Sequence, residues 1–276
     1  MKDNLLRERI NMNYKVISMD FDGTLLTSKK NVTDTTKKVL LKYKNDNYII
    51  IGITARNLAS ASDVCDINMF NYLILNNGSY IYDVEEGKAI NINKIDKNIA
   101  IDITTHINDE VEQIDYCSLN KYYIYKNKIK KNKDFLVQIN NIDEIDETIG
   151  RMNIFIKDKN RLIKAKEYIE KTFNDIDVIE MSDTDNKNNR EWLVLNNKGT
   201  NKLETLKILC EKLDIPIDKV IFFGDSTNDL SIIGQVGIGI AMGNALEEVK
   251  KQSKYITLSN DNDGIAYYLE KYKNNL

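Results

Sequence analysis

Three short apolar runs constrain this sequence most, because each is followed within two residues by a side chain that carries oxygen. The runs are Tyr14–Met19, Tyr48–Ile53 and Val220–Phe223. Each has the length of a β-strand, and Tyr48–Ile53 is almost continuously apolar, as strands buried on both faces of a parallel sheet are. The three runs therefore predict buried strands that end in polar residues.

Helical and strand-like segments alternate along much of the chain. The predicted helices are Val32–Lys44, Asn57–Asp66, Lys202–Leu213, Asp229–Ile233 and Ala245–Gln252. The further predicted strands are Tyr72–Leu75, Ile238–Ala241 and Tyr255–Thr257. This βαβα alternation predicts an α/β fold with a doubly wound, mostly parallel, Rossmann-like sheet, in which ligands bind at the carboxyl ends of the strands.

The middle of the chain has a different pattern and predicts an inserted α/β lobe. Its predicted elements include the strands Tyr122–Tyr125 and Met152–Ile156 and the helix Arg161–Phe173. We therefore divide the chain into a core domain of residues 1–82 and 190–276 and a cap domain of residues 83–189. The polar segment Ser182–Asn189 is either a mobile substrate loop or an inert connector.

Composition and charge indicate a small-molecule partner. The chain holds 39 Lys and Arg against 42 Asp and Glu, a formal net charge of −3, and it has no basic block that would suggest nucleic acid. No apolar run approaches the ~20 residues of a membrane span, and the polar start, Met1–Asn13, is no signal peptide. We expect a cytoplasmic protein, with Met12 as an alternative start to Met1. The sequence carries no signature of an oligomeric state.

The single histidine and the three cysteines narrow the possible chemistry. His106 has no neighbouring nucleophile, which excludes histidine-based triads and multi-histidine metal sites. Cys65, Cys117 and Cys210 are widely spaced without a C-x-x-C pair, so they predict buried free thiols rather than a disulfide framework or a zinc site. Catalysis must then use carboxylates, lysines, hydroxyls or a hard metal ion.

The first polar strand end carries two carboxylates. Asp20 and Asp22 leave one strand together, and Gly23 allows a sharp turn after them. Because Mg²⁺ is commonly held by one or two carboxylates plus a substrate phosphate, the pair suits a site for a phosphoryl group. An Asp-x-Asp tripeptide alone is more often a surface turn, and it is the apolar strand before it that favours the site.

Two further strand ends carry suitable groups. Thr54 and Ala55 precede a predicted helix, where a hydroxyl and backbone amides can bind phosphate oxygens. After the last of the three strands, Asp225 is a candidate metal ligand, while Asn228 and Asp229 can orient phosphate or metal-bound water. Taken singly, the first group is more often a helix N-cap, and the second is better explained by an Asx turn.

Together these strings resemble the haloacid dehalogenase superfamily, specifically its Cof-type phosphatases with a large α/β cap. The resemblance extends from about Tyr14 to the end of the chain. It rests on Asp20–Leu25, Thr54–Arg56 and Gly224–Asp229, and on Ala241–Ala245 and Asp261–Gly264, which are typical of the subfamily. The sequence differs from the family pattern at Ala55 and Leu203, where a glycine is usual.

The family also implies a lysine that neutralises the nucleophile and the phosphate, and two lysines are candidates. Lys202 opens an apolar-periodic stretch and stands one helix and one strand before Asp225. Lys198 is the lysine that keeps a following glycine. We choose Lys202 and keep Lys198 as the alternative.

The resemblance implies an Mg²⁺-dependent phosphatase that acts on small phosphorylated metabolites, such as sugar phosphates, through an aspartyl-phosphate. Asp20 would be the nucleophile, and Asp22 the general acid and base, with a pKa above that of Asp20. The implied metal ligands are Asp20, the Asp22 carbonyl and Asp225. The implied phosphate contacts are Thr54, Ala55, Lys202 and Asn228, with Asp229 in support. A phosphomutase of similar architecture and a catalytically inactive phospho-ligand-binding module are the alternatives.

Only the carbonyl of Asp22 is assigned to the metal, so its side chain can be changed without removing a ligand. An Asp22→Asn variant is expected to bind Mg²⁺ and to turn over slowly, because its amide cannot move the proton. Calorimetric titration with Mg²⁺ and a phosphate-release assay measure the two properties. Loss of metal binding in this variant would undo the assignment.

Overall fold

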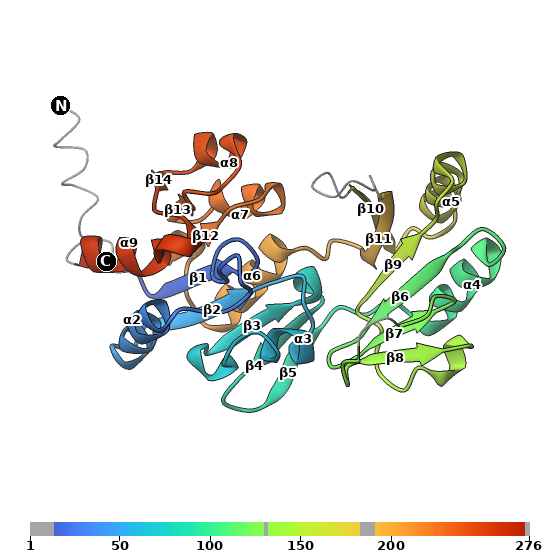
Figure 1. The fold of residues 1–276 in the computed structure, drawn as a ribbon, viewed down its shortest axis with the longest axis horizontal. Helices are drawn as coiled ribbons and strands as arrows, with labels where there is room; N and C mark the ends of the chain where they lie inside the picture. The colour runs from blue at the N-terminus through green and yellow to red at the C-terminus, as the bar shows by residue number, and fades with distance from the viewer. Residues whose placement is uncertain (1–13, 130–131, 183–190, 274–276) are drawn as a thin grey trace.

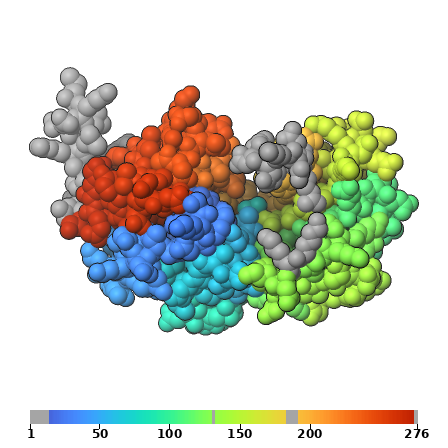
Figure 2. All heavy atoms as spheres, viewed as in Figure 1, coloured from blue at the N-terminus to red at the C-terminus, as the bar shows by residue number. Residues whose placement is uncertain are grey.

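The computed structural model describes residues 14–129, 132–182 and 191–273, which form two β-sheets with helices around them (Figure 1). Residues 1–13, with both candidate start methionines, and residues 183–189 of the predicted polar segment lie outside the described residues. The first sheet and its helices occupy one end of the long axis, and the second sheet occupies the other (Figures 1 and 2). The fold class is α/β, as predicted.

The first sheet has eight strands in the order β14-β13-β12-β1-β2-β3-β4-β5. Its strands are β1 (Val16–Asp20), β2 (Ile49–Ile53), β3 (Tyr72–Leu75), β4 (Tyr80–Asp83), β5 (Lys88–Ile92), β12 (Val220–Gly224), β13 (Ile238–Ala241) and β14 (Tyr255–Ile256). The strands from β14 to β3 are parallel, and β4 and β5 are antiparallel additions. Every residue of β1 and β12 is buried, as expected for strands covered on both faces.

Helices cover both faces of this sheet. They are α2 (Asp34–Asn45), α3 (Leu58–Ser62), α6 (Lys202–Lys212), α7 (Leu230–Ile233), α8 (Glu247–Gln252) and α9 (Gly264–Tyr272). α2 packs against α9, whereas α6 and α8 both pack against α7. The chain moves from β1 to β2 in one direction across the sheet and from β12 to β13 in the other, so right-handed crossovers place α2 and α7 on opposite faces. Among the described residues, no helix is long and apolar enough to cross a membrane.

Strand β1 is the point at which the direction of winding reverses. It pairs in parallel with β2 on one side and with β12 on the other, so that Ser18 lies beside both Ile51 and Phe222. In doubly wound sheets, the crevice for ligands opens at such a point, outside the carboxyl ends of the strands. Asp20 is the last residue of β1, and this topology places it at that crevice.

The second sheet has six strands in the order β10-β11-β9-β6-β7-β8. Its strands are β6 (Gln113–Cys117), β7 (Tyr122–Tyr125), β8 (Leu136–Ile139), β9 (Arg151–Phe155), β10 (Ile176–Ser182) and β11 (Glu191–Asn197). The accompanying helices are α4 (Lys97–Ile107) and α5 (Lys159–Thr172). Ile103 of α4 and Ile169 of α5 are fully buried in a hydrophobic cluster with the strands, so this sheet has a core of its own.

The chain passes between the two sheets at points that differ from both predicted domain boundaries. β5 lies beyond residue 82 but belongs to the first sheet, because it forms an antiparallel pair with β4. β11 lies beyond residue 189 but belongs to the second sheet, where Leu193 and Leu195 are buried in its core. The chain passes from the first sheet to the second after Ile92 and returns to the first after Asn197. We call these two places the crossing points. The division into a core and a cap domain stays a prediction, with these crossing points in place of the earlier boundaries.

The predicted elements of the first sheet lie within a few residues of their positions, and β3 and β13 begin and end as predicted. The helix over Asn57–Asp66 was predicted too long, because Asn57 is the N-cap and α3 ends at Ser62. Asp66 caps the following turn by accepting from the Asn68 amide, so the chain has left the helix before it. The short 3₁₀ helices are Ile67–Met69, Asn76–Gly78, Ile142–Glu144, Ile217–Lys219, Thr227–Asp229 and Asn260–Asn262.

Gly52 tests how tightly β2 is packed. A Cβ at this position would lie 2.6 Å from Phe21 and 2.8 Å from Leu73, closer than side chains approach one another. Gly52→Ala is therefore expected to lower the free energy of unfolding by about 1–3 kcal/mol. Gly234→Ala is the control, because its Cβ would meet a backbone oxygen at 3.6 Å. Urea denaturation measures both variants, and equal stabilities would contradict the packing.

Candidate active site

A buried lysine joins two strand ends of the first sheet. Lys202, the first residue of α6, has its Nζ 2.6 Å from Oδ1 of Asp20 and 2.9 Å from Oδ1 of Asp229, and all three side chains are buried. Asn201 fixes the start of α6 by accepting a hydrogen bond from a backbone amide of its first turn. Lys198 is exposed and donates to a backbone carbonyl, so Lys202 is the lysine that reaches Asp20.

The turn after β12 holds Asp225 and Asp229 beside this lysine. Oδ2 of Asp229 accepts from the backbone amides of Asp225 and Ser226 at 3.1 and 3.2 Å. Oδ1 of Asp225 accepts from the Thr24 hydroxyl at 2.8 Å. Gly23 has a φ of +82°, and a Cβ there would lie 2.2 Å from Oδ2 of Asp225. The loop after Asp20 can therefore lie against Asp225 because Gly23, the loop residue that contacts Asp225, has no side chain.

Three carboxylates share this site with Lys202. Oxygens of Asp20, Asp225 and Asp229 lie within 4.8 Å of one another. Burial, opposed by Lys202 and reinforced by Asp229, raises the pKa of Asp20 to about 7, and burial raises the pKa of Asp225 to about 6. A divalent cation would balance the excess negative charge, and carboxylate oxygens are the ligands that hard cations prefer. The donor set therefore fits a hard divalent metal ion.

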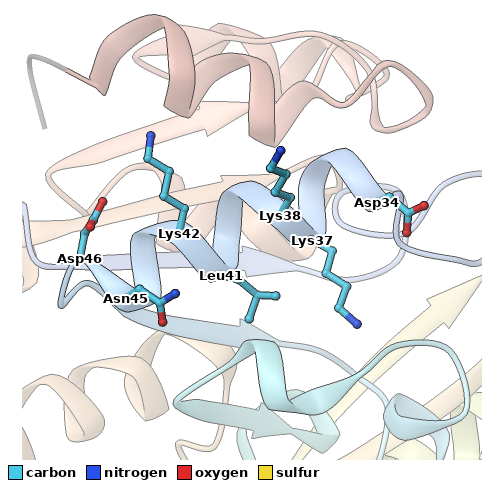
Figure 3. A pocket seen from close by; sticks show the side chains of 7 residues that line it. All are labelled: Asp34, Lys37, Lys38, Leu41, Lys42, Asn45 and Asp46. Carbon is cyan, nitrogen blue, oxygen red and sulfur yellow. The ribbon is translucent and has the colours of Figure 1, made fainter.

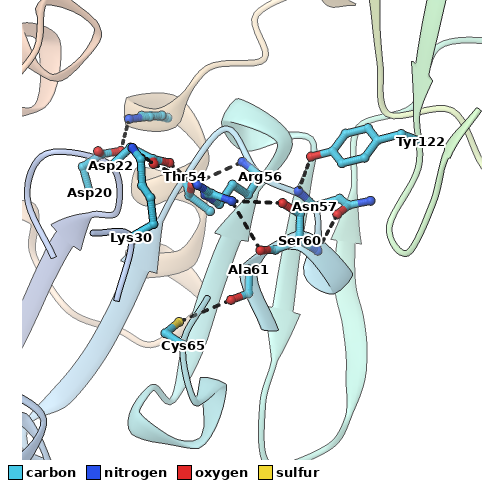
Figure 4. Close-up of polar contacts among 11 residues, drawn as sticks. Asp20, Asp22, Lys30, Thr54, Arg56, Asn57, Ser60, Ala61, Cys65 and Tyr122 are labelled. Atoms are coloured by element: carbon cyan, nitrogen blue, oxygen red, sulfur yellow. Dashed lines mark hydrogen bonds and ion pairs between the residues drawn. The ribbon is translucent and has the colours of Figure 1, made fainter. Parts of the chain in front are cut away.

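Asp22 lies outside this acidic cluster and is held by two cations. Arg56 donates from Nε and Nη2 to the two carboxylate oxygens of Asp22, each at 2.8 Å, and Nζ of Lys30 lies 2.8 Å from Oδ1 (Figure 4). Burial alone would raise the pKa of Asp22, but these hydrogen bonds lower it to about 2. The expected order of pKa values, with Asp22 above Asp20, is wrong in this arrangement, because Arg56 and Lys30 favour the ionised Asp22 carboxylate.

The predicted phosphate-contacting residues border the cluster in two places. Thr54 is buried directly after β2, its hydroxyl accepts from the Arg56 amide at 3.2 Å, and the half-buried Ala55 follows it. Asn228 is exposed on the turn after β12, where its side chain accepts from the Ser226 hydroxyl. Thr54 thus lies buried at the end of β2, and Asn228 is exposed to solvent beside Asp229.

The partners of Asp22 and Asp225 could not be assigned from the sequence. Thr24 and Arg56 belong to the motifs Asp20–Leu25 and Thr54–Arg56, and membership of these motifs could have indicated that they are site residues. Their contacts, however, are made only when separate strand ends come together. Lys30 belongs to no motif, so no pattern in the sequence could predict its contact with Asp22.

The two strings near the C-terminus brace the loop after Asp20. Three hydrogen bonds of 2.8 Å do this: Asn244 Nδ2 to the Gly23 carbonyl, Asn260 Nδ2 to the Leu26 carbonyl, and the Ser28 amide to Oδ1 of Asp261. The backbone amide of Asn260, the residue directly before the second string, also donates to Oδ1 of Asn244 at 2.9 Å, which ties the two strings to each other. These asparagines therefore help to fix the position of the candidate nucleophile.

A surface hollow of about 590 Å³ lies along α2 and is separate from this site (Figure 3). It is lined by Asp34, Lys37, Lys38, Leu41, Lys42, Asn45 and Asp46. None of the predicted site residues lines it. Lys37 and Lys42 at its edge already form ion pairs with Asp66 and Glu270, so the hollow is no part of the candidate active site.

The chain is similar to one family along nearly all of its length. A family model described as haloacid dehalogenase-like hydrolase matches residues 17–269. The chain is 27% identical to the stress response protein YhaX of Bacillus subtilis (strain 168), over 95% of this chain and 94% of that protein. It is 26% identical to the 5-amino-6-(5-phospho-D-ribitylamino)uracil phosphatase YcsE of the same strain, over 94% and 96%. A crystal structure of a haloacid dehalogenase-like hydrolase from Bacteroides thetaiotaomicron matches with a TM-score of 0.79 and 25% identity, over 94% and 99%.

Removal of the Lys202 charge should destabilise the metal-free protein in a pH-dependent way. Lys202→Met leaves Asp20 and Asp229 buried without their cation and is expected to cost about 3–5 kcal/mol at neutral pH. Lys202 lowers the pKa of Asp20 in the wild type, so its removal should raise that pKa further above about 7. The loss should therefore be smaller near pH 5, where Asp20 is protonated with or without Lys202, and largest above pH about 7, where Asp20 of the wild type ionises.

Urea denaturation in EDTA at several pH values measures this loss. Lys207→Met is the matched control on the same helix. Lys207 is partly exposed, and its one ion pair among the described residues is with Glu204, so its removal should change stability by about 0.5 kcal/mol or less. If the two variants lost the same stability at every pH, the buried ion pair would have no such role.

Proposed function

This chain belongs to the haloacid dehalogenase-like hydrolases and is a phosphatase of that family, and we propose that it uses Mg²⁺ to hydrolyse small phosphorylated metabolites through an aspartyl-phosphate. The observation that carries the proposal is Asp20, held at the carboxyl end of β1 by Lys202 and beside Asp225. The name of its relative YcsE specifies a small phosphorylated molecule, which supports a substrate of that kind. We propose the cytoplasm as its compartment.

Asp20 is the proposed nucleophile. Its carboxylate would attack phosphorus, and the bond from phosphorus to the ester oxygen would break, which gives an aspartyl-phosphate. Lys202, 2.6 Å from that carboxylate, would favour its ionised form and attract the phosphoryl oxygens. The Thr54 hydroxyl and the Ala55 amide would donate hydrogen bonds to the same oxygens. Asp229, fully buried, is a positioning residue that holds Lys202.

Asp22 is the proposed general acid and base. Its carboxyl would give a proton to the leaving ester oxygen and later take one from the water that attacks the aspartyl-phosphate. It must first separate from Arg56 and Lys30, whose hydrogen bonds lower its pKa to about 2. An arriving phosphate ester would compete for these two cations, and loss of their hydrogen bonds would return the pKa of Asp22 towards its ordinary value.

The acidic cluster is the proposed metal site. Asp20, the Asp22 carbonyl and Asp225 would hold Mg²⁺, which when bound supplies positive charge to the phosphoryl oxygens. Thr24 orients Asp225 by donating to its Oδ1 at 2.8 Å. Asn228, exposed on the turn after β12, would donate to the phosphate.

Phosphate release tests the reaction and its need for metal. With Mg²⁺ the protein is expected to release inorganic phosphate from p-nitrophenyl phosphate and from some members of a panel of phosphorylated metabolites. EDTA should abolish the release, and added Mg²⁺ should restore it. Asp20→Asn should lower kcat below detection, because an amide is a poor nucleophile. The control, Asp109→Asn, changes an exposed carboxylate beside the second sheet and should leave kcat unchanged.

Product analysis separates this proposal from its alternatives. Free phosphate released from metabolites supports the hydrolase. Return of the phosphoryl group to another position on a sugar, in the presence of a bisphosphate activator, would instead support a phosphomutase. Binding of phosphorylated ligands with no release from any ester would support an inactive binding module.

A further inference from the structure

Arg151, on β9, is a buried cation for which the described residues provide no ion pair, although, against the effect of burial, the charge of Asp115 on the neighbouring β6 helps to raise its pKa. Only 7% of the Arg151 surface is exposed, and its Nη2 contacts the Cys117 sulfur at 3.7 Å. Its Nε is buried with no acceptor. A guanidinium stays protonated in proteins, so this positive charge is buried away from water. The side chain that it contacts is the Cys117 thiol. Such a charge is costly unless an anion joins it.

The strand register places Arg151 on the face of the second sheet that is opposite to its hydrophobic core. Arg151 lies level with Cys117 on β6 and Asn196 on β11, and Cys117 is level with Tyr122 on β7. The residues next to them along the strands, including Met152 of β9, are buried in the hydrophobic cluster with α4 and α5. Because side chains alternate along a strand, Asn196, Arg151, Cys117 and Tyr122 share the other face. We call these four residues the Arg151 row.

The Arg151 row borders residues 54–57, which follow β2 and include the proposed phosphate contacts Thr54 and Ala55; we call these residues the phosphate loop. The Tyr122 hydroxyl accepts from the Asn57 amide at 2.9 Å, and Figure 4 shows this side chain reaching the start of α3. Next to Cys117, the Ser118 carbonyl accepts from Nδ2 of Asn76 at 3.1 Å. The Asn76 amide in turn donates to the Arg56 carbonyl at 2.9 Å. The row is thus connected to the phosphate loop through two separate contacts.

Unpartnered polar atoms gather in the same region. Seven buried side-chain nitrogen or oxygen atoms of the described residues have no hydrogen-bond partner. Six of them belong to the row or to its neighbours on the phosphate-loop side: Asn57 Nδ2, Asn76 Oδ1, Asn77 Oδ1, Ser118 Oγ, Arg151 Nε and Asn196 Oδ1. Buried polar atoms are nearly always hydrogen-bonded, so this cluster calls for polar groups from outside the chain, either a ligand or ordered water.

We infer that Arg151 binds a second anionic group of the substrate, a carboxylate or a further phosphate, while the phosphoryl group to be removed lies at Asp20. The planar guanidinium suits such a group, because it can donate two parallel hydrogen bonds to a carboxylate or phosphate. The amide and hydroxyl groups around it would bind the polar part of the substrate between the two anions. This inference rests on the proposed function and narrows its substrates to phosphate esters with two separate anionic groups.

The experiment uses phosphate esters in matched pairs that differ in the second anionic group. One pair is 6-phosphogluconate and glucose 6-phosphate, and the other is 3-phosphoglycerate and glycerol 3-phosphate. kcat and KM are measured with Mg²⁺ for the wild type and for Arg151→Met, Arg151→Lys and Arg161→Met. Arg161 is exposed on α5, so its variant controls for the loss of one arginine near the second sheet. Arg151→Lys keeps the charge and serves if Arg151→Met does not fold.

For the wild type, we expect kcat/KM to favour the anionic member of at least one pair by roughly tenfold or more, mainly through KM. Arg151→Met should remove this preference, Arg151→Lys should keep part of it, and Arg161→Met should keep all of it. A merely structural role of Arg151 would not change one member of a pair more than the other.

Two results would overturn the inference while the proposed function stands. One is a wild type that hydrolyses p-nitrophenyl phosphate but has equal kcat/KM for both members of every pair, which would mean that Arg151 contacts only water. The other is a preference that persists in folded Arg151→Met. If the wild type hydrolysed no ester at all, the proposed function would fail first, and the inference with it.

Discussion

The contact between Lys202 and Asp20 is the interaction on which the rest of the site depends. It joins the start of α6 to the end of β1, and the same ammonium is shared with Asp229, which is fully buried. Two carboxylates on one lysine, with Asp225 close by, leave the site with more negative than positive charge. A divalent cation would balance this excess and favour the ionised form of the carboxylates, and a phosphate ester would bring negative charge to the cation in turn.

The fold explains how these groups meet. β1 lies between β2 and β12 in parallel register, so three polar strand ends share one edge of the sheet. The loop after β1 can approach Asp225 because Gly23 has no side chain there. Asn244 and Asn260 then hold that loop from the last third of the chain. The second sheet contacts the same edge through Tyr122 and Asn57, which places its polar face beside the phosphate loop.

Much of this site could be predicted from the sequence, because Asp20 and Asp225 each follow an apolar strand, and the carboxyl ends of parallel strands lie at one edge of the sheet. Lys202 could be selected over its neighbour from the apolar period of the helix that it opens. The pairing of Asp22 with Arg56 could not be predicted, since it depends on the conformation of two loops rather than on a pattern. The burial of Arg151 could not be predicted either. In the sequence it is a single basic residue in a strand, and it is buried because β9 lies between β6 and β11. The crossing points were missed because a strand pattern does not say which of two sheets the strand joins.

The most direct test of the account is to identify the residue that receives the phosphoryl group. Asp22→Asn protein, in which hydrolysis of the intermediate should be slow, would be mixed with Mg²⁺ and p-nitrophenyl phosphate, quenched in acid and digested for mass spectrometry. The account predicts one added phosphoryl group on the peptide that contains Asp20, and none when Asp20 is also changed to Asn. A phosphoryl group on any other residue, or turnover without a phosphorylated protein, would contradict it.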